Sequence, residues 1–340
     1  MFNPFASNTQ ENYTDLKDLF KETNKSEEKN VYLKDYVREW VEEKRMNVKP
    51  ATIRVYKNRV YNHILPYFGN IRLAEITRKG ILDLQKKIAT NVSANTANEV
   101  LKTIKALLRD AKRDELVEKD VSVGILPVKE RRELRARESY HRALSVEEQK
   151  YFIQELKNDY YYPFIALMLQ TGMRQGEVSA LTADDLDFKN KVIHVHRTMT
   201  FGEDNRIAPG DSPKTYTSNR DIPMNKAIQK ILSKVDCNVD GPIFKSITGK
   251  YVTNSVVNRS IKRTLERLEL KGISIPTITS HALRDTFATR YAEQHRDEGG
   301  DLETLKELLG HANLTMTADL YVHVLDDTKH QGMAKLNIRT

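Results

Sequence analysis

The chain has 340 residues, 39% of them hydrophobic, which favours two domains with buried cores over one. Its net charge of +8 fits a polyanionic partner, although a merely basic surface would have the same composition. The single cysteine, Cys237, excludes an internal disulfide and fits a reducing compartment. No apolar run approaches the roughly 18 residues of a membrane span, and no signal-peptide core is present, so we expect a cytoplasmic protein without a membrane partner.

Composition and periodicity divide the chain into five segments. The first is polar and mixed in charge, and the third is basic and lacks a regular apolar period. The predicted segments are an N-terminal tail (1–29), a helical domain (30–126), a basic linker (127–142), a second domain (143–326) and a C-terminal tail (327–340).

The first domain is predicted to be a bundle of four or five helices. Apolar residues recur at three- and four-residue spacing around Trp40, which places them on one helical face. Pro50 opens a second helix, at a position where its missing N–H costs nothing. Thr77 is a suitable cap for a third helix, and a fourth is expected from about Asn95. No strand signal competes, so this domain is expected to be all-helical.

Basic residues on the bundle and in the linker are candidates for phosphate contacts. On the bundle we single out Lys102 and Lys105, although ion pairs within the helices explain such a face equally well. In the linker the candidates are Arg131, Arg132 and Arg135. A basic linker can follow a DNA backbone between two domains, and the alternative is a charged, exposed connector.

The second domain is predicted to be rich in helices with a small sheet. Ser145 and Glu148 form a capping box, and another helix begins at Gln175. Residues 191–197 alternate in polarity, which indicates a strand, and a turn rich in glycine and proline, with Pro209 and Gly210, leads on to Arg220–Pro223. This region is therefore expected to be a small sheet or hairpin. The other expected helices cover residues 146–157, 160–171, 226–234, 253–269, 282–295, 302–309 and 315–324.

Six side chains of this domain make a set suited to phosphoryl transfer. Arginine forks hold phosphate oxygens, histidine and lysine move protons, and a tyrosine hydroxyl can attack phosphorus. Each residue alone has an ordinary explanation as a cap, a core side chain or a solvated charge. Their order and combination carry the prediction. The set is Arg174, Lys214, His281, Arg284, His311 and Tyr321.

No cofactor is expected. The sequence has neither a Walker loop nor an acidic metal cluster. His194 and His196 share one face of the predicted strand, but without further ligands we favour exposed or DNA-facing side chains over a metal site.

The motifs around the six residues resemble those of the tyrosine recombinase (phage integrase) family. Residues 171–177 (TGMRQGE) resemble its first arginine box, and residues 213–223 resemble its lysine hairpin. Residues 281–284 (HALR) and 308–311 (LLGH) resemble its second box, and Tyr321 stands where the family has its nucleophile. The resemblance extends over about residues 30–326.

Two features depart from the family pattern. Asp285 stands where many relatives have histidine, which we expect to be tolerated. Residues 1–29 are too short and too acidic for the arm-binding domain that larger integrases carry, so the resemblance does not predict recognition of accessory arm sites.

The resemblance implies a helical core-binding domain and a catalytic domain of mixed α and β structure that together form a clamp around DNA. It implies that Arg174, Arg284 and His311 stabilise the attacked phosphate. Tyr321 would form a 3′-phosphotyrosyl intermediate, Lys214 would protonate the leaving 5′-oxygen, and His281 would assist proton transfer.

The implied partners are double-stranded DNA attachment sites and three further copies of the chain, which act as a homotetramer on two duplexes. An excisionase or a DNA-bending protein is a further candidate, and the implied setting is the nucleoid of a bacterium. Two other functions stay open at this point. A type IB topoisomerase rejoins the same strand by similar chemistry, and a catalytically silent regulator binds DNA with the same fold.

Overall fold

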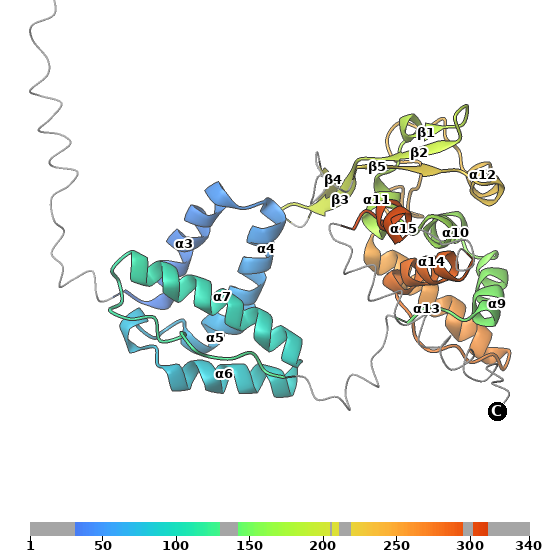
Figure 1. Cartoon of the computed structure of the whole chain (residues 1–340). Coiled ribbons are helices and arrows are strands. Elements are labelled where there is room, and N and C mark those ends of the chain that lie inside the picture. The colour runs from blue at the N-terminus through green and yellow to red at the C-terminus, as the bar shows by residue number, and fades with distance from the viewer. Residues whose placement is uncertain (1–30, 130–141, 205, 211–218, 295–301, 312–340) are drawn as a thin grey trace, which may run out of the picture. The chain divides into compact units, whose positions relative to one another are not determined.

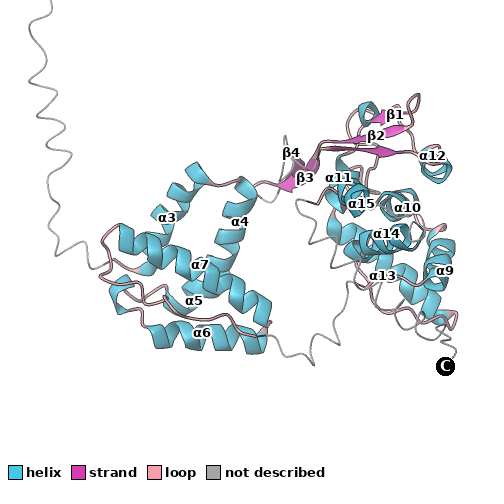
Figure 2. Cartoon of the chain, in the orientation of Figure 1, coloured by secondary structure: helices cyan, strands magenta, loops and turns pink. Residues whose placement is uncertain are grey.

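The protein is described by a computed structural model that covers residues 31–129, 142–204, 206–210, 219–294 and 302–311. The chain divides into two compact units, Met1–Leu134 and Arg135–Thr340, and each is described by itself (Figure 1). The structure is rich in helix with small sheets, which confirms the predicted fold class (Figure 2). The residue limits of the predicted domains stay predictions.

The first unit is a helical bundle around one apolar core, as predicted. Trp40 is 1% exposed, and its indole Nε1 donates to Asp110 at 2.8 Å. Pro50 opens its helix as expected, Thr77 caps the next by accepting from Gly80, and Ser93 caps the last. The elements are α3 Leu33–Asn47, α4 Pro50–Arg59, the π-helix η1 Val60–Ile64, α5 Leu65–Phe68, the 3-10 helix η2 Leu73–Glu75, α6 Arg78–Asn91 and α7 Ala94–Arg113.

The chain that leaves α7 is fastened back onto the bundle by side chains. Arg78 donates to the carbonyl oxygens of Val123 and Gly124, at 2.6 and 3.1 Å. The Asn98 amide makes two bonds with the backbone of Val128, at 2.9 and 2.7 Å. The path of the chain is therefore fixed by the bundle as far as Val128.

A three-stranded antiparallel sheet and a two-stranded hairpin lie in the second unit, within the residues that the structure describes. In the sheet, of strand order β1-β2-β5, Ile193 pairs with Ile222 and both side chains enter the core. His194 pairs with Asp221 on the other face, and their side chains lie 2.7 Å apart. The strands are β1 Leu186–Asp187, β2 Val192–Val195, β3 Thr198–Phe201, β4 Ile207–Gly210 and β5 Arg220–Pro223.

Helices predominate over strands in the described part of the second unit and pack around its apolar core. Ser145 and Glu148 form the predicted capping box at the start of α9. The helices are α9 Val146–Leu156, α10 Tyr162–Thr171, α11 Gln175–Ala180, the 3-10 helix η3 Ala183–Asp185, α12 Lys226–Leu232, α13 Asn254–Leu270, α14 Ser280–Gln294 and α15 Leu302–Leu309.

One local prediction was wrong. Pro209 and Gly210, interpreted as part of a turn, lie in strand β4, where they pair with Met199 and Thr198 of β3. The strands of a two-stranded hairpin have free edges, where proline is tolerated without loss of a ladder bond. The predicted helix over 315–324 lies outside the described residues.

Among the helices that the structure describes, none combines the length and the apolar composition needed to cross a lipid bilayer.

Candidate phosphate-binding site and family membership

Arg174 lies between the end of α10 and the start of α11. Gly172 ends α10 with φ +65°, and a Cβ there would lie 2.4 Å from the ring of Phe287, so only glycine fits this turn. Arg174 is the residue before α11, and its backbone N–H donates to the Glu177 carboxylate at 2.8 Å. The turn and this bond together direct the Arg174 side chain toward the end of α15.

His281 and Arg284 lie in the first two turns of α14. Two amides of α13 hold the start of this helix, because Asn258 accepts from the Ser280 backbone N–H at 2.9 Å and Asn254 accepts from its hydroxyl at 2.8 Å. His281 is exposed and Arg284 is only 7% exposed, so the helix presents one of the two residues to solvent and the other to the interior.

The C-terminal end of α15 is the point on which the site converges. Gly310 has φ +63° and donates to the Glu307 carbonyl at 2.9 Å, while the N–H of His311 donates to the Lys306 carbonyl at 3.1 Å. These are the two bonds of a Schellman motif, which satisfies the carbonyls of the penultimate turn and leaves the last ones open.

Three arginines from three separate places in the chain donate to the two remaining carbonyl oxygens of α15 and to that of Gly310. Cations at the C-terminal end of a helix are also favoured by the helix dipole. The pairs are Arg220 with Leu308, Arg284 with Leu309 and Arg174 with Gly310, at 2.7, 2.6 and 3.3 Å. The helix end and the arginines thus fix one another, and His311 is the next residue of the chain.

Glu177 is the carboxylate that balances this cluster. Its two oxygens accept from Arg220 at 3.2 and 2.8 Å, and one of them also accepts from Arg174 at 2.9 Å. Burial alone would raise the pKa of Glu177, but the charges and hydrogen bonds of Arg220 and Arg174 hold it below its ordinary value. Even with the charge of Asp285, which also acts on Arg284, the three guanidinium groups outnumber the carboxylates, and the cluster keeps an excess of positive charge.

The excess positive charge of the cluster and the burial of its side chains disfavour the protonated forms of Arg284 and His311. Burial lowers the pKa of Arg284 to about 9, and the neighbouring Arg174 lowers it in the same direction. Burial likewise lowers the pKa of His311 to about 4, followed by the charges of Arg284 and Arg174. His311 is therefore a neutral imidazole near pH 7, able to donate one hydrogen bond without adding charge.

Such a cluster is suited to binding an anion. Arg174 keeps 37% of its side chain exposed, so a ligand can reach it from solvent. A phosphate would meet planar guanidinium forks and a neutral donor that are held in place before it arrives.

Three of the six predicted site residues are brought together, namely Arg174, Arg284 and His311. His281 lies one helical turn before Arg284 on α14. Lys214 and Tyr321 lie outside the described residues, as do the linker candidates Arg131, Arg132 and Arg135.

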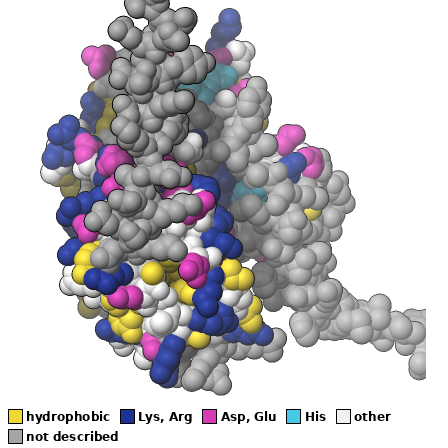
Figure 3. Space-filling view, turned by 90° about the vertical axis from the view of Figure 1, so that its left-hand side faces the viewer, with side chains coloured by type: hydrophobic (Ala, Val, Ile, Leu, Met, Phe, Trp, Pro, Cys, Tyr) yellow, Lys and Arg dark blue, Asp and Glu magenta, His cyan; other side chains and the backbone are white. Residues whose placement is uncertain are grey.

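The two candidates on the bundle bind groups of the protein itself. Lys102 donates to Glu99 at 2.6 Å, and Lys105 donates to the Ile125 carbonyl at 2.6 Å. On the face drawn in Figure 3, Lys and Arg side chains are interspersed with Asp and Glu. The structure therefore includes the ion pairs that were the alternative explanation of this surface.

Sequence reasoning did not assign Glu177 and Arg220 to the site. Both lie inside the motifs that carry the family resemblance, but nothing in their spacing shows that a glutamate on α11 and an arginine on β5 meet. The signal that was available is the position of Glu177 three residues after Arg174, the spacing of a capping contact.

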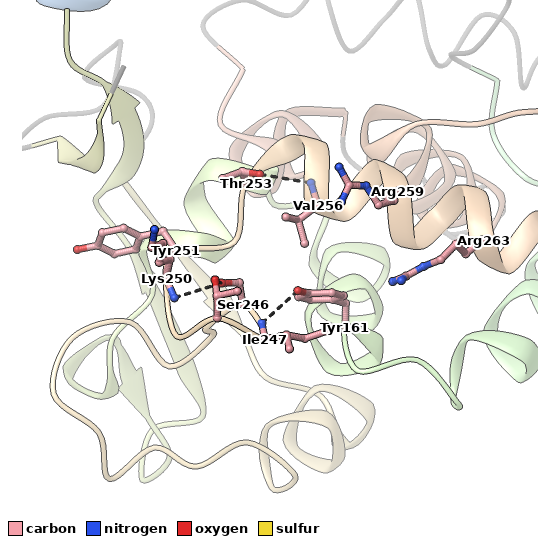
Figure 4. A pocket seen from close by; sticks show the side chains of 10 residues that line it. Tyr161, Ser246, Ile247, Lys250, Tyr251, Thr253, Val256, Arg259 and Arg263 are labelled. Atoms are coloured by element: carbon pink, nitrogen blue, oxygen red, sulfur yellow. Dashed lines mark hydrogen bonds between the residues drawn. The ribbon is translucent and has the colours of Figure 1, made fainter. Parts of the chain in front are cut away.

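A cleft of the second unit lies elsewhere among the described residues. It is lined by residues of the α13 start and of the preceding loop, and Tyr161 accepts from the Ile247 N–H across it at 3.3 Å (Figure 4). A phosphate carried on a polymer needs an open surface rather than an enclosed cavity, so we place the site at the arginine cluster.

Comparison with known proteins agrees with these motifs. The Phage integrase family matches residues 142–328, more than half of the chain, and the N-terminal SAM-like domain of phage integrases matches residues 32–89. A transposase from transposon Tn916 of Enterococcus faecalis is 29% identical over 194 residues, which cover 52% of this chain and 45% of that protein. The chain thus spans less than half the length of this relative.

Two other matches cover most of the chain. A XerC-like tyrosine recombinase of Caldanaerobacter subterraneus is 26% identical over 340 residues, which cover 90% of this chain and 83% of that protein. The Tn1549 transposon integrase, solved in complex with transposon right end DNA, has the same fold, with a TM-score of 0.71, 23% identity and coverage of 90% of this chain and 99% of that chain. The motifs, the fold and the family match together show that this chain belongs to the phage integrase family.

Proposed function

We propose that this protein is a site-specific DNA recombinase that integrates or excises a mobile element through a 3′-phosphotyrosyl intermediate. One observation carries the proposal. Arg174, Arg284 and His311 converge on the turn after α15, with an excess of positive charge and with access to solvent. The group that fits such a site is the scissile phosphate of a DNA strand.

The pocket would mainly stabilise the transition state of the cleavage reaction. As phosphorus is attacked, negative charge grows on the non-bridging oxygens, and Arg174, Arg284 and the neutral His311 would donate to them. Because these donors are held by backbone carbonyls and by Glu177, little reorganisation is needed when the charge develops. This arrangement favours the transition state over the ground state.

The residues proposed for the covalent chemistry are those to which the family resemblance assigns it. The hydroxyl oxygen of Tyr321 would form a bond to phosphorus while the bond to the 5′-oxygen breaks. Lys214 would give the leaving oxygen its proton, and His281 would assist the transfer of the tyrosine proton. The tyrosyl ester retains the energy of the phosphodiester, so a 5′-hydroxyl can reverse the step without ATP.

The two units are proposed to act as a clamp on duplex DNA. The helical core-binding domain and the catalytic domain would hold opposite faces, and the linker with Arg131, Arg132 and Arg135 would follow the backbone between them. Exchange between two duplexes requires four strands to be cut, one by each protomer, which supports a homotetramer.

The proposed substrates are the attachment sites of the element that encodes the protein, in a bacterial cytoplasm. The Tn916 transposase and the Tn1549 integrase in complex with transposon right end DNA support a mobile element as the source. We propose an excisionase or a DNA-bending protein as a partner that sets the direction of the reaction.

The decisive experiment begins with the DNA on both sides of the gene. A repeat in this DNA gives the attachment sites, and paired sites are then incubated with the protein beside supercoiled plasmid. Recombinant product and a protein–DNA adduct that survives detergent are expected. Relaxation without recombination would identify a topoisomerase, and binding without any nicking would identify a silent regulator.

A further inference from the structure

Arg220 is an arginine of the cluster for which the proposed mechanism has no role. It stands at the start of β5, and its side chain is 5% exposed. Each of its three nitrogens donates to a protein acceptor. Nε reaches the Leu308 carbonyl at 2.7 Å, and the two Nη atoms reach the carboxylate of Glu177 at 3.2 and 2.8 Å.

Arg174 belongs to the same cluster as Arg220 but is more exposed and less tightly bound. Its side chain is 37% exposed, and its contact with the Gly310 carbonyl is long at 3.3 Å. A phosphate can therefore take over donors of Arg174. Both Nη atoms of Arg220 are paired with the Glu177 carboxylate, whereas those of the similarly buried Arg284 donate to neutral carbonyl oxygens. Arg220 is therefore the guanidinium placed to hold the protein rather than the substrate.

The strand that carries Arg220 is itself well anchored. Arg220 pairs with Val195 in the ladder between β2 and β5, and the nearby Ile222 is buried in the core. From this fixed point the side chain reaches α11 through Glu177 and α15 through Leu308. It also packs against the turn, since a Cβ on Gly310 would lie 3.0 Å from Nη1 of Arg220.

We propose that Arg220 is a positioning residue that sets the geometry of the phosphate pocket without touching the phosphate. It holds the Glu177 carboxylate that orients Arg174, and it holds the last turn of α15, from which His311 follows. The proposal rests on the proposed DNA cleavage. A misplacement of about 1 Å in a catalytic group can cost about 100-fold in rate, so loss of this support should slow the chemical step strongly.

Two variants separate the geometry from the charge. Arg220→Lys keeps the positive charge beside buried Glu177 but loses the fork that reaches two elements at once. Arg220→Gln loses the charge as well. The matched control is Arg197→Lys, because Arg197 in the same unit donates to buried Asp185 at 2.9 and 2.7 Å and belongs to no part of the cluster.

The measurements are the single-turnover rate of adduct formation, the affinity for the same DNA and the thermal melting point. We expect Arg220→Lys to form the adduct about 10- to 100-fold more slowly at unchanged DNA affinity. Arg197→Lys should stay within about twofold of the parent rate. This difference should hold even if Arg197→Lys and Arg220→Lys melt at the same temperature, below that of the parent. A purely structural role for Arg220 would not separate the two variants in this way.

A histidine titration by NMR gives a second readout. The charge of Arg220 is one of the causes that lower the pKa of His311. Arg220→Gln should therefore raise that pKa, while Arg220→Lys and Arg197→Lys leave it near the parent value.

The outcomes are distinguishable. If the parent protein forms no adduct on its attachment sites, the proposed function is wrong. If the parent is active and Arg220→Lys cleaves as fast as Arg197→Lys, the positioning role is wrong. Failure of both Arg220 variants to fold would assign the residue to stability alone and would equally overturn the proposal.

Discussion

Arg284 donates to the carbonyl oxygen of Leu309 at 2.6 Å, and its other terminal nitrogen donates to the carbonyl of Gly172 at 2.7 Å. One buried guanidinium therefore joins the end of α10 to the end of α15. Because both acceptors belong to helix ends, the proposed phosphate pocket and the packing of three helices depend on the same side chain.

The turn after α15 offers a test of this coupling. Gly310→Ala places a Cβ about 3.0 Å from Arg220 in a residue with φ +63°, so we expect a loss of about 1–3 kcal/mol in the free energy of unfolding. Gly272→Ala is the matched control, since Gly272 has φ +78° at the end of α13 and open space around it. Urea unfolding should show the smaller loss, about 1 kcal/mol, for the control.

Gly310→Ala and Gly272→Ala should also differ in the rate of DNA cleavage. Only Gly310→Ala presses on the cluster, so only this variant should slow adduct formation. Equal stability losses and equal cleavage rates for the two variants would contradict the coupling.

His311 should make the protein sensitive to mild acid. Burial lowers its pKa from 6.5 to about 4 in the folded state, so the unfolded chain binds a proton first as the pH falls. The contribution of His311 to stability is therefore complete above pH 6.5 and is lost between pH 6.5 and pH 4. We expect an effect of about 1 kcal/mol after a discount for the partial exposure of the ring.

The measurement is the difference between the parent and His311→Gln in urea unfolding at pH 7.5 and pH 4.5. Carboxylates titrate in both proteins and cancel in this difference. A parent protein that loses no more stability than His311→Gln over this interval would show that His311 is not held neutral.

The nucleophile is predicted to be Tyr321. Tyr321→Phe removes one oxygen and should abolish the covalent adduct while DNA affinity stays within about twofold of the parent. Tyr291→Phe is the control, because the Tyr291 ring is partly buried against the small cluster of Ala288, Leu305 and Leu309. If Tyr291→Phe abolishes the adduct and Tyr321→Phe does not, the assignment is wrong.

Lys214 is predicted to be the general acid, and sulfur substitution tests this role. An alkoxide leaving group needs a proton in the transition state, whereas a thiolate, with a thiol pKa of about 8.5, needs little help. Lys214→Ala should cleave ordinary DNA at least about 100-fold more slowly and recover most of the rate when sulfur replaces the bridging 5′-oxygen.

Arg174→Ala is the matched variant for this substrate. The proposed role of Arg174 is to stabilise charge on the non-bridging oxygens, which the bridging sulfur leaves unchanged. Arg174→Ala should therefore not recover its cleavage rate on the sulfur substrate. Equal rescue of both variants, or no rescue of Lys214→Ala, would remove Lys214 from this role and make His281 the next candidate.

The linker should govern the salt dependence of DNA binding. Replacing Arg131, Arg132 and Arg135 by glutamine should flatten the plot of log affinity against log salt by about 0.9 for each arginine that contacts a phosphate, without a change in preferred sequence. Lys105→Gln is the comparison, because Lys105 donates to the Ile125 carbonyl and should change the slope less. An unchanged slope in the triple variant would exclude phosphate contacts by the linker.

Sequence predicted the helices well because their apolar spacing and their caps are local. Pro50, Thr77 and the Ser145–Glu148 box each mark a helix start within a few residues, and the structure confirms all three. A small sheet or hairpin was predicted for residues 191–223 and is present, but Pro209 was placed in its turn rather than in strand β4, since the limits of a two-stranded pair depend on partners rather than on a local pattern.

Part of the site was predictable and part was not. Arg174, Arg284 and His311 lie in motifs that can be read along the chain. The contacts of Arg220 with Glu177 and with Leu308 join residues 43 and 88 positions apart, and no local pattern encodes which arginine meets a phosphate and which meets the protein. That distinction depends on which acceptors each guanidinium meets, and only the fold determines this.

The acceptors at the end of α15 belong to the main chain, and this affects how the cluster can be studied and altered. Changing the side chain of Leu308 or Leu309 alters packing but leaves the carbonyl oxygens that receive Arg220 and Arg284 in place. A substitution scan across this turn would therefore report on the apolar contacts and stay silent about the polar ones. To weaken one of these acceptors, one must exchange the following amide for an ester, whose carbonyl oxygen accepts less strongly, and to move it one must shift the helix end itself by a residue.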